Sequence, residues 1–308
     1  MVVSPTSFSE IVILMTEIVQ NCPLCGSMDS SPFDRREFRG SPVSNRICRG
    51  CGLVYQSPRM TEAESQAFYE TEYRRLYQGQ EGPNPKDLAV QAARAQVALD
   101  FVHKQVTSAS SILDIGCSTG ILLQQFQTHY QTQAFGVEPG KVYRQYAQSL
   151  GLEICSSLEE LQLVHESRFN LVSMMHVLEH LPNPLEYLRN LREKYLEPDG
   201  WLLLEVPNLY AHDCFEVAHL ISFSAHTLTQ VVQKAGYRVT QLRAQGQPRS
   251  QLIPLYLTLL ARPDINASFS FEPDHLVRTQ RQVGFIRRWF VERLFPERAW
   301  ISPASTQH

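Results

Sequence analysis

The sequence predicts an α/β fold, a Rossmann-like sheet of seven strands preceded by a small N-terminal zinc ribbon. The first observation is a short apolar run at 111–115, which leads through a glycine-containing turn into a segment with helical periodicity. The second is another apolar run at 133–137 that ends in an acid, as expected for the next strand of a βαβ unit. The third is a pair of CxxC sequences near the N-terminus, which together supply four thiols.

The turn after the first of these strands has the features of a nucleoside-binding loop. Asp114 ends the strand, where a carboxylate can accept hydrogen bonds from an ammonium or hydroxyl group. Gly116 and Gly120 allow the backbone to approach a ligand, but they lack the full spacing of the dinucleotide fingerprint. Glu138 ends the second strand and is placed to bind both hydroxyls of a ribose. A single adenosine ligand is therefore favoured over NAD, and a Rossmann-like turn without a ligand is the alternative.

These residues resemble motifs I and II of the class I S-adenosylmethionine-dependent methyltransferases. The resemblance implies S-adenosylmethionine as the cofactor. It also implies an adenine contact at the end of the third strand, at Ser157, although a serine there is equally ordinary in a loop. His176 and Val177 follow the fourth strand and are expected at the same edge of the sheet. The predicted cofactor-binding residues are Asp114, Gly116, Cys117, Gly120, Glu138, Ser157, His176 and Val177.

The two CxxC sequences predict a structural zinc site. Each pair can present two thiolates to one ion, and four thiolates describe a closed tetrahedral site with no position left for a catalytic water. A redox pair or four unrelated thiols are the alternatives. The predicted ligands are Cys22, Cys25, Cys48 and Cys51.

Histidines are the candidates for the chemical step. Methyl transfer needs an aligned nucleophile and removal of its proton, which histidine can accept near neutral pH. His180, His219 and His226 are the candidate bases, and Glu179 is placed to orient or polarise one of them. A Glu–His pair also fits a divalent ion that chelates a diol or catechol, although one adjacent pair supplies few ligands.

The order of motifs over the chain resembles the zinc-ribbon group of class I methyltransferases and is similar to nucleotide-sugar C-methyltransferases. The resemblance runs from Cys22 to about Pro263 and implies that Tyr69 or Tyr73 serves the substrate together with His180 and His219. The catalytic residues predicted on this basis are His180, His219, Glu179 and Tyr73.

The expected acceptor is a small hydroxylated molecule, a nucleotide-linked or glycan sugar. Sugar C-methyltransferases carry a further C-terminal domain where this sequence has a loop and one helix, so O-methylation is at least as well supported as C-methylation. The VLEHLPNP segment at 177–184 also resembles that of quinone O-methyltransferases. A quinone or phenol O-methyltransferase, and a non-catalytic scaffold that keeps the cofactor fold, remain the alternatives.

Composition restricts the partners. The net charge of −3 provides no overall basic field for nucleic acid, and no apolar run is long enough to cross a membrane. An odd, clustered set of seven cysteines is typical of a reducing compartment, which predicts a cytoplasmic protein. An amphipathic helix at 275–295 carries five arginines, for which docking on the main domain or on a protein partner is favoured over anionic lipid.

The predicted division of the chain has five parts. They are a leader helix at 1–20, the zinc ribbon at 21–60, linker helices at 61–106, the methyltransferase domain at 107–262, and a C-terminal loop and amphipathic helix at 263–308.

Overall fold

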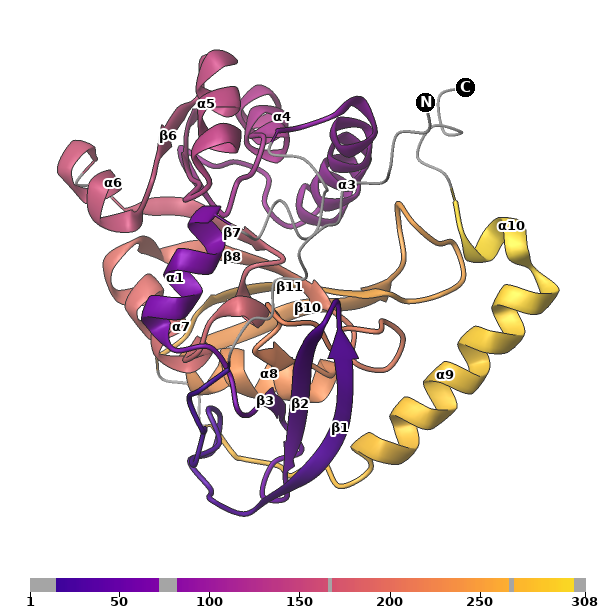
Figure 1. Cartoon of the computed structure of the whole chain (residues 1–308). Coiled ribbons are helices and arrows are strands. Elements are labelled where there is room, and N and C mark those ends of the chain that lie inside the picture. Colours follow the sequence, from indigo (N-terminus) through magenta and orange to yellow (C-terminus); the bar gives the residue numbers. More distant parts are fainter. Residues whose placement is uncertain (1–14, 72–81, 166–167, 266–268, 302–308) are drawn as a thin grey trace, which may run out of the picture.

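The computed structural model describes residues 15–71, 82–165, 168–265 and 269–301. At its centre lies a seven-stranded sheet with the order β10-β11-β8-β7-β4-β5-β6 (Figure 1). Strand β11 runs antiparallel to both of its neighbours, β10 and β8, and all other neighbouring pairs in this sheet are parallel. The strands are β4 (Ser111–Ile115), β5 (Gln133–Val137), β6 (Glu153–Cys155), β7 (Phe169–Met175), β8 (Leu196–Pro207), β10 (Tyr237–Gln245) and β11 (Tyr256–Pro263). The predicted Rossmann-like sheet is confirmed.

Helices cover both faces of this sheet, which is why its central strands are apolar runs. One apolar core joins one face to α3, α4 and α5, and a second core joins the other face to α6, α7 and α8. The helices are α3 (Pro85–Val102), α4 (Ile121–Tyr130), α5 (Lys141–Ser149), α6 (Leu158–Val164), α7 (Pro184–Lys194) and α8 (Ala225–Lys234).

The cysteine-containing region forms a second sheet that extends into the main domain. Its strands are β1 (Ser30–Phe38), β2 (Ser41–Cys48), β3 (Val54–Gln56) and β9 (Ile221–Ser222), in that order. The fourth strand comes from the loop after β8, so backbone hydrogen bonds cross between the predicted ribbon and the predicted methyltransferase domain. Buried Leu53 and Tyr55 belong to the same apolar core as Leu220. The boundary predicted at residue 60 therefore crosses a continuous sheet and a continuous core.

The leader helix predicted for residues 1–20 is wrong for the described residues 15–20, which are not helical. Residues 1–14 lie outside the described part of the chain, but 15–20 are extended rather than helical. Glu17 forms an antiparallel bridge with Arg59, and their side chains form an ion pair of 2.8 Å. A helix would satisfy the backbone of this segment internally, whereas the bridge draws it against the end of the ribbon.

Two helices lie among the described residues of the segment 61–106, where linker helices were predicted. Helix α1 (Glu62–Thr71) begins at a capping box, in which the N–H of Thr61 donates to the Glu64 carboxylate at 2.7 Å and the N–H of Glu64 donates to the Thr61 hydroxyl at 3.3 Å. Asn84 caps α3 by accepting a hydrogen bond from the N–H of Asp87. Tyr73 lies outside the described residues, and its predicted role stays a prediction.

The C-terminal segment is helical as predicted. Helix α9 (Val277–Leu294) and the short α10 (Pro296–Ala299) lie at one edge of the molecule (Figure 1). None of the helices among the described residues combines the length and apolar character needed to cross a membrane.

Candidate functional site

A pocket of about 990 Å³ opens where β4, β5, β6 and β7 end at their carboxyl edge. Ligands bind at this edge in doubly wound sheets because the loops after parallel strands meet there. Most of the residues predicted for the cofactor line the pocket, namely Asp114, Gly116, Cys117, Glu138, Ser157, His176 and Val177. The predicted residues at the ends of these four strands therefore lie around one cavity.

The turn after β4 depends on glycine at residue 116. Gly116 has φ +74°, a left-handed conformation that favours glycine, and a Cβ there would lie 2.5 Å from the Val177 side chain. Gly120 also has positive φ, but it is not among the pocket-lining residues, and a Cβ there would meet Leu152 at 2.4 Å. The role of Gly120 in the described structure is therefore close packing behind the turn.

The carboxylate of Glu138 is held by the backbone of two turns. It accepts hydrogen bonds from the N–H of Ser118 at 2.9 Å and from that of Gly140 at 2.8 Å. Glu138 is 4% exposed and lines the pocket, so the carboxylate is oriented before any ligand enters. A carboxylate oriented in this way at the end of the second strand fits the two hydroxyls of a ribose.

Asp114 is a buried acid with an altered charge state. Burial raises the pKa of Asp114 to about 7, a hydrogen bond from the Ser173 hydroxyl opposes the rise, and the negative charge of Glu138 adds to it. Because the shift arises from isolation in the protein interior, a cation bound beside Asp114 would favour the charged form. The position fits the ammonium group of an amino-acid ligand.

Two further residues predicted for the cofactor, Cys117 and Ser157, also have structural roles in the fold. The buried side chain of Cys117 packs against Gly136, where a Cβ would lie 2.7 Å from its sulfur, and the N–H of Cys117 donates to Val137 at 3.1 Å. Ser157 lines the pocket and also caps α6 by accepting a hydrogen bond from the N–H of Glu160. Ser157 can therefore cap this helix and also face a ligand in the pocket.

His176 connects two buried carboxylates at the end of β7. Its Nε2 lies 3.2 Å from Glu205 and its Nδ1 lies 3.3 Å from Glu179. Burial and the charge of Arg94 lower the pKa of His176, but the interactions with the carboxylates of Glu179 and Glu205 outweigh them and the pKa is raised. A protonated His176 donates a hydrogen bond to Glu205 and places its positive charge within ion-pair distance of Glu179.

Glu179, His180 and His219 form a cluster beside the pocket, with one ligand-type atom from each lying within 4.8 Å of the others. His180 and Glu179 come from the 3-10 turn η1 (Leu178–His180), whereas His219 precedes β9. Nδ1 of His180 donates to the carbonyl of Ala218 at 2.8 Å, and Nδ1 of His219 donates to that of Cys214 at 2.9 Å. A carbonyl can only accept, so these bonds assign the Nδ1–H tautomer to the neutral form of each ring, in which Nε2 is the basic atom.

The charges in this cluster are unequal. Burial lowers the pKa of His180 to about 4, Glu179 opposes that change, and His219 adds to it. Burial alone would raise the pKa of Glu179, but the adjacent His176 and the imidazoles of His180 and His219 lower it to about 2. At neutral pH the cluster therefore combines a carboxylate with a neutral imidazole, and a proton taken up by His180 would lie beside a negative charge.

The spacing of this cluster favours acid–base chemistry over a metal. Nε2 of His180 lies 4.0 Å from the Glu179 carboxylate, and the cluster spans up to 4.8 Å. Nitrogen and oxygen ligands at about 2.0–2.1 Å from a tetrahedral zinc would lie about 3.3 Å apart. The side chains would have to move together to hold such an ion.

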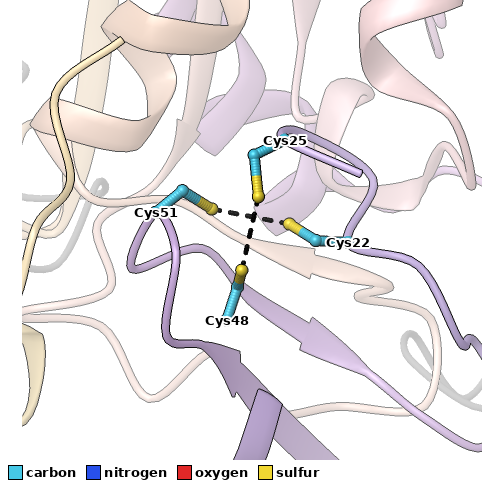
Figure 2. Close-up of side chains that lie close together, drawn as sticks. All are labelled: Cys22, Cys25, Cys48 and Cys51. Atoms are coloured by element: carbon cyan, nitrogen blue, oxygen red, sulfur yellow. Dashed lines mark hydrogen bonds between the residues drawn. The ribbon is translucent and has the colours of Figure 1, made fainter. Parts of the chain in front are cut away.

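The four cysteines have a different geometry. Figure 2 shows their side chains pointing toward one another from the two CxxC turns. The sulfurs of Cys22 and Cys51 lie 3.5 Å apart, and those of Cys25 and Cys48 lie 3.4 Å apart. A tetrahedral zinc with Zn–S of about 2.3 Å places its sulfurs about 3.8 Å apart, so the arrangement fits a closed tetrathiolate site. All four predicted zinc ligands are brought together.

A family model described as "Methyltransferase domain" matches residues 86–242, about half of the chain. The chain belongs to this methyltransferase family. The matched segment begins in α3 and ends in β10, so it contains the pocket-forming strands and the Glu179–His180–His219 cluster. It does not include the ribbon or α9. The predicted membership of the methyltransferases is confirmed, whereas the narrower resemblance to sugar C-methyltransferases stays a prediction.

Curated relatives of this methyltransferase domain include quinone-pathway enzymes. The chain is 28% identical over 122 residues to the "Ubiquinone biosynthesis O-methyltransferase" of Actinobacillus pleuropneumoniae, covering 36% of this chain and 52% of that protein. It is 33% identical over 107 residues to the protein of the same name from Haemophilus ducreyi, covering 32% and 45% respectively. The chain thus spans about half the length of these relatives.

A solved structure shares the fold of the methyltransferase domain. It is the 1,6-didemethyltoxoflavin-N1-methyltransferase of Burkholderia thailandensis, which contains 1,6-didemethyltoxoflavin and S-adenosylhomocysteine. The TM-score is 0.53 at 18% identity, and the alignment covers 69% of this chain and 96% of that one. At this identity the likeness concerns the architecture of the domain.

Several pocket residues of the methyltransferase were not predicted. Arg59 and Met60 come from the end of the ribbon, Arg94 comes from α3, and Leu220 precedes β9. No local motif distinguishes these residues, because each reaches the pocket through packing between distant segments. His226, a candidate base, lies elsewhere: it is half-buried outside the pocket lining, and its Nε2 donates to the carbonyl of Glu272 at 2.7 Å.

Proposed function

We propose that this methyltransferase transfers the methyl group of S-adenosylmethionine to a hydroxyl group of a small acceptor. The observation that carries the proposal is the pocket itself, which extends from Glu138 and Asp114 to His180. At one end lie a preoriented carboxylate suited to a ribose and a buried acid suited to an ammonium. At the other lies a neutral imidazole supported by a carboxylate.

The cofactor supplies a sulfonium-bound methyl group that is ready for displacement, so the chain's task is positioning and proton removal. We assign Glu138 to the ribose hydroxyls and Asp114 to the amino-acid portion. His180 or His219 accepts the acceptor's proton at Nε2, and Glu179 stabilises the positive charge that results. A base positioned in this way contributes about 10²- to 10⁴-fold to the rate.

Two acceptor classes follow from different observations. Phenol or quinol O-methylation is supported by the names of the quinone-pathway relatives and by the apolar pocket residues Met60, Leu181 and Leu220. Sugar methylation, on oxygen or carbon, is supported by the order of the ribbon and methyltransferase motifs in the sequence. Incubation with labelled methyl donor and a panel of polyhydroxylated phenols, nucleotide sugars and glycans would separate them, with mass spectrometry locating the methyl group.

Calorimetry with S-adenosylhomocysteine tests the cofactor assignment. Binding is expected for the wild-type chain and is expected to weaken strongly in Glu138→Ala. Glu153→Ala is a matched control, because Glu153 is exposed on the neighbouring β6 and does not line the pocket. Absence of binding, or binding that Glu138→Ala leaves unchanged, would count against the proposal. Binding without transfer to any acceptor would favour the non-catalytic scaffold.

A further inference from the structure

Helix α9 is fixed to the main domain by one of its faces. Arg281 and Arg288 each donate hydrogen bonds to backbone carbonyls in the segment 209–211. Between them, the helix backbone comes so close to the domain at Gly284 that a Cβ would lie 2.0 Å from the carbonyl oxygen of Tyr210. The predicted docking on the main domain is present on this face, and it determines which residues face outward.

The opposite face carries an apolar stripe in solvent. Val283, Ile286, Phe290 and Leu294 recur at spacings of three and four residues and are 59%, 57%, 51% and 65% exposed. Trp289 borders them and is 52% exposed. We call these five residues the outer stripe. Single exposed apolar side chains are ordinary, but a contiguous set on a firmly docked helix indicates a surface that binds something.

Arginines border the outer stripe on both sides. At 100° per residue, Arg287 lies on one side of the stripe and Arg293 on the other. Glu292 is the only acid in α9, and it is held by Arg288 at 2.9 Å and by the indole N–H of Trp300 at 3.2 Å. Among the described residues, neither Arg287 nor Arg293 has a carboxylate within ion-pair distance. The outward face is therefore apolar along its centre and positive along its margins.

We propose that the outer stripe of α9 binds the surface of an anionic lipid bilayer. An amphipathic helix with bulky apolar residues, a bordering tryptophan and flanking arginines lies in the plane of the interface. The apolar residues enter the boundary with the acyl chains, and Arg287 and Arg293 pair with lipid phosphates. The proposal stands on α9 alone and does not depend on the proposed function.

A second copy of the chain fits this face less well. A two-fold contact sets the same surface of each copy against the other. It would bring Arg287 and Arg293 of both copies together with no acid on the face to neutralise them. An anionic surface supplies the missing negative charge. The chain has a net charge of −3, so the attraction must come from this local set of arginines.

Vesicle sedimentation with the full-length protein tests the proposal. The bound fraction is expected to be about tenfold greater with vesicles containing phosphatidylglycerol than with phosphatidylcholine alone, and to fall as salt is raised. Ile286→Glu combined with Phe290→Glu is expected to abolish binding, and Arg287→Glu combined with Arg293→Glu is expected to remove the preference for anionic lipid. These side chains are exposed, so the variants are expected to fold.

Controls make the result specific to α9. Leu163→Glu changes a side chain on α6 that is 86% exposed, and is expected to bind vesicles as wild type does. A blue shift of the tryptophan emission on binding should disappear in Trp289→Phe. The proposal is overturned by absence of vesicle binding, by equal binding to both lipids, or by binding that the stripe variants leave unchanged. Light scattering that reveals a dimer dissociated by Phe290→Glu, without vesicle binding, would assign the stripe to a second copy.

Discussion

The carboxylate of Glu138 accepts a 2.9 Å hydrogen bond from the N–H of Ser118, which joins the end of β5 to the turn that follows β4. The acid proposed for the ribose thus also holds a loop that lines the pocket. Removing it has two consequences, because both the ligand contact and the shape of the loop are affected.

The first prediction concerns Glu138→Gln. We expect S-adenosylhomocysteine affinity to fall by about 10- to 100-fold, since hydrogen bonds to a charged group are worth about 1.5–3 kcal/mol. Calorimetry measures the loss, and Glu153→Gln serves as the control. Unchanged affinity would remove Glu138 from the cofactor site.

The second prediction concerns the pH dependence of stability. The pKa of Asp114 is about 7 in the folded protein and about 3.9 in an unfolded chain, so the folded state holds a proton that the unfolded state releases. The associated stability is fully present below about pH 4 and is lost as the pH rises through 7. At about 1.36 kcal/mol per pH unit, the loss is at most about 4 kcal/mol.

Asp114→Asn tests this assignment, because asparagine keeps an oxygen that can accept the hydrogen bond from Ser173. In urea unfolding of the ligand-free proteins, the free energy of unfolding of the variant relative to wild type should increase as the pH is raised from 5 to 8. The variant should nevertheless bind S-adenosylhomocysteine less tightly than wild type does. Parallel pH profiles for variant and wild type would show that Asp114 is not the titrating group.

The third prediction concerns the proposed base. His180→Gln and His219→Gln are compared, because one of these two histidines is proposed to be the base. The variant that lacks the base is expected to transfer the methyl group about 10²- to 10⁴-fold more slowly than wild type. Affinity for S-adenosylhomocysteine should stay close to that of wild type, because neither imidazole is assigned to the cofactor. Single-turnover transfer measures the rate. His226→Gln, outside the pocket, is the control, and an equal loss in that variant would contradict the assignment.

The fourth prediction concerns the cysteine site. Elemental analysis is expected to find one zinc per chain, and Cys25→Ser is expected to lose it, since a structural zinc contributes directly to folding. Because β9 pairs with β3 and Arg59 of the ribbon lines the pocket, the same variant should also weaken ligand binding. Cys155→Ser is the control. Full zinc retention by Cys25→Ser would make the four-thiolate assignment wrong.

The features that the sequence determined by itself are local ones. Two CxxC turns, a strand followed by a glycine turn, and an acid at the next strand's end depend on spacings of a few residues. Gly116 illustrates the physical reason, because its positive φ is a requirement of the turn itself. The capping box at Thr61 and the periodicity of α9 were likewise readable, since both follow from the geometry of a single helix.

The tertiary structure alone decided which distant residues meet. The rings of His180 and His219 come within 4.9 Å of each other, centroid to centroid, because the loop before β9 returns to the ribbon. Arg59 enters the pocket from that ribbon, and Cys117 turns its side chain into the core. Such relationships depend on strand pairing and packing between segments far apart in the chain, for which no spacing in the sequence carries a signal.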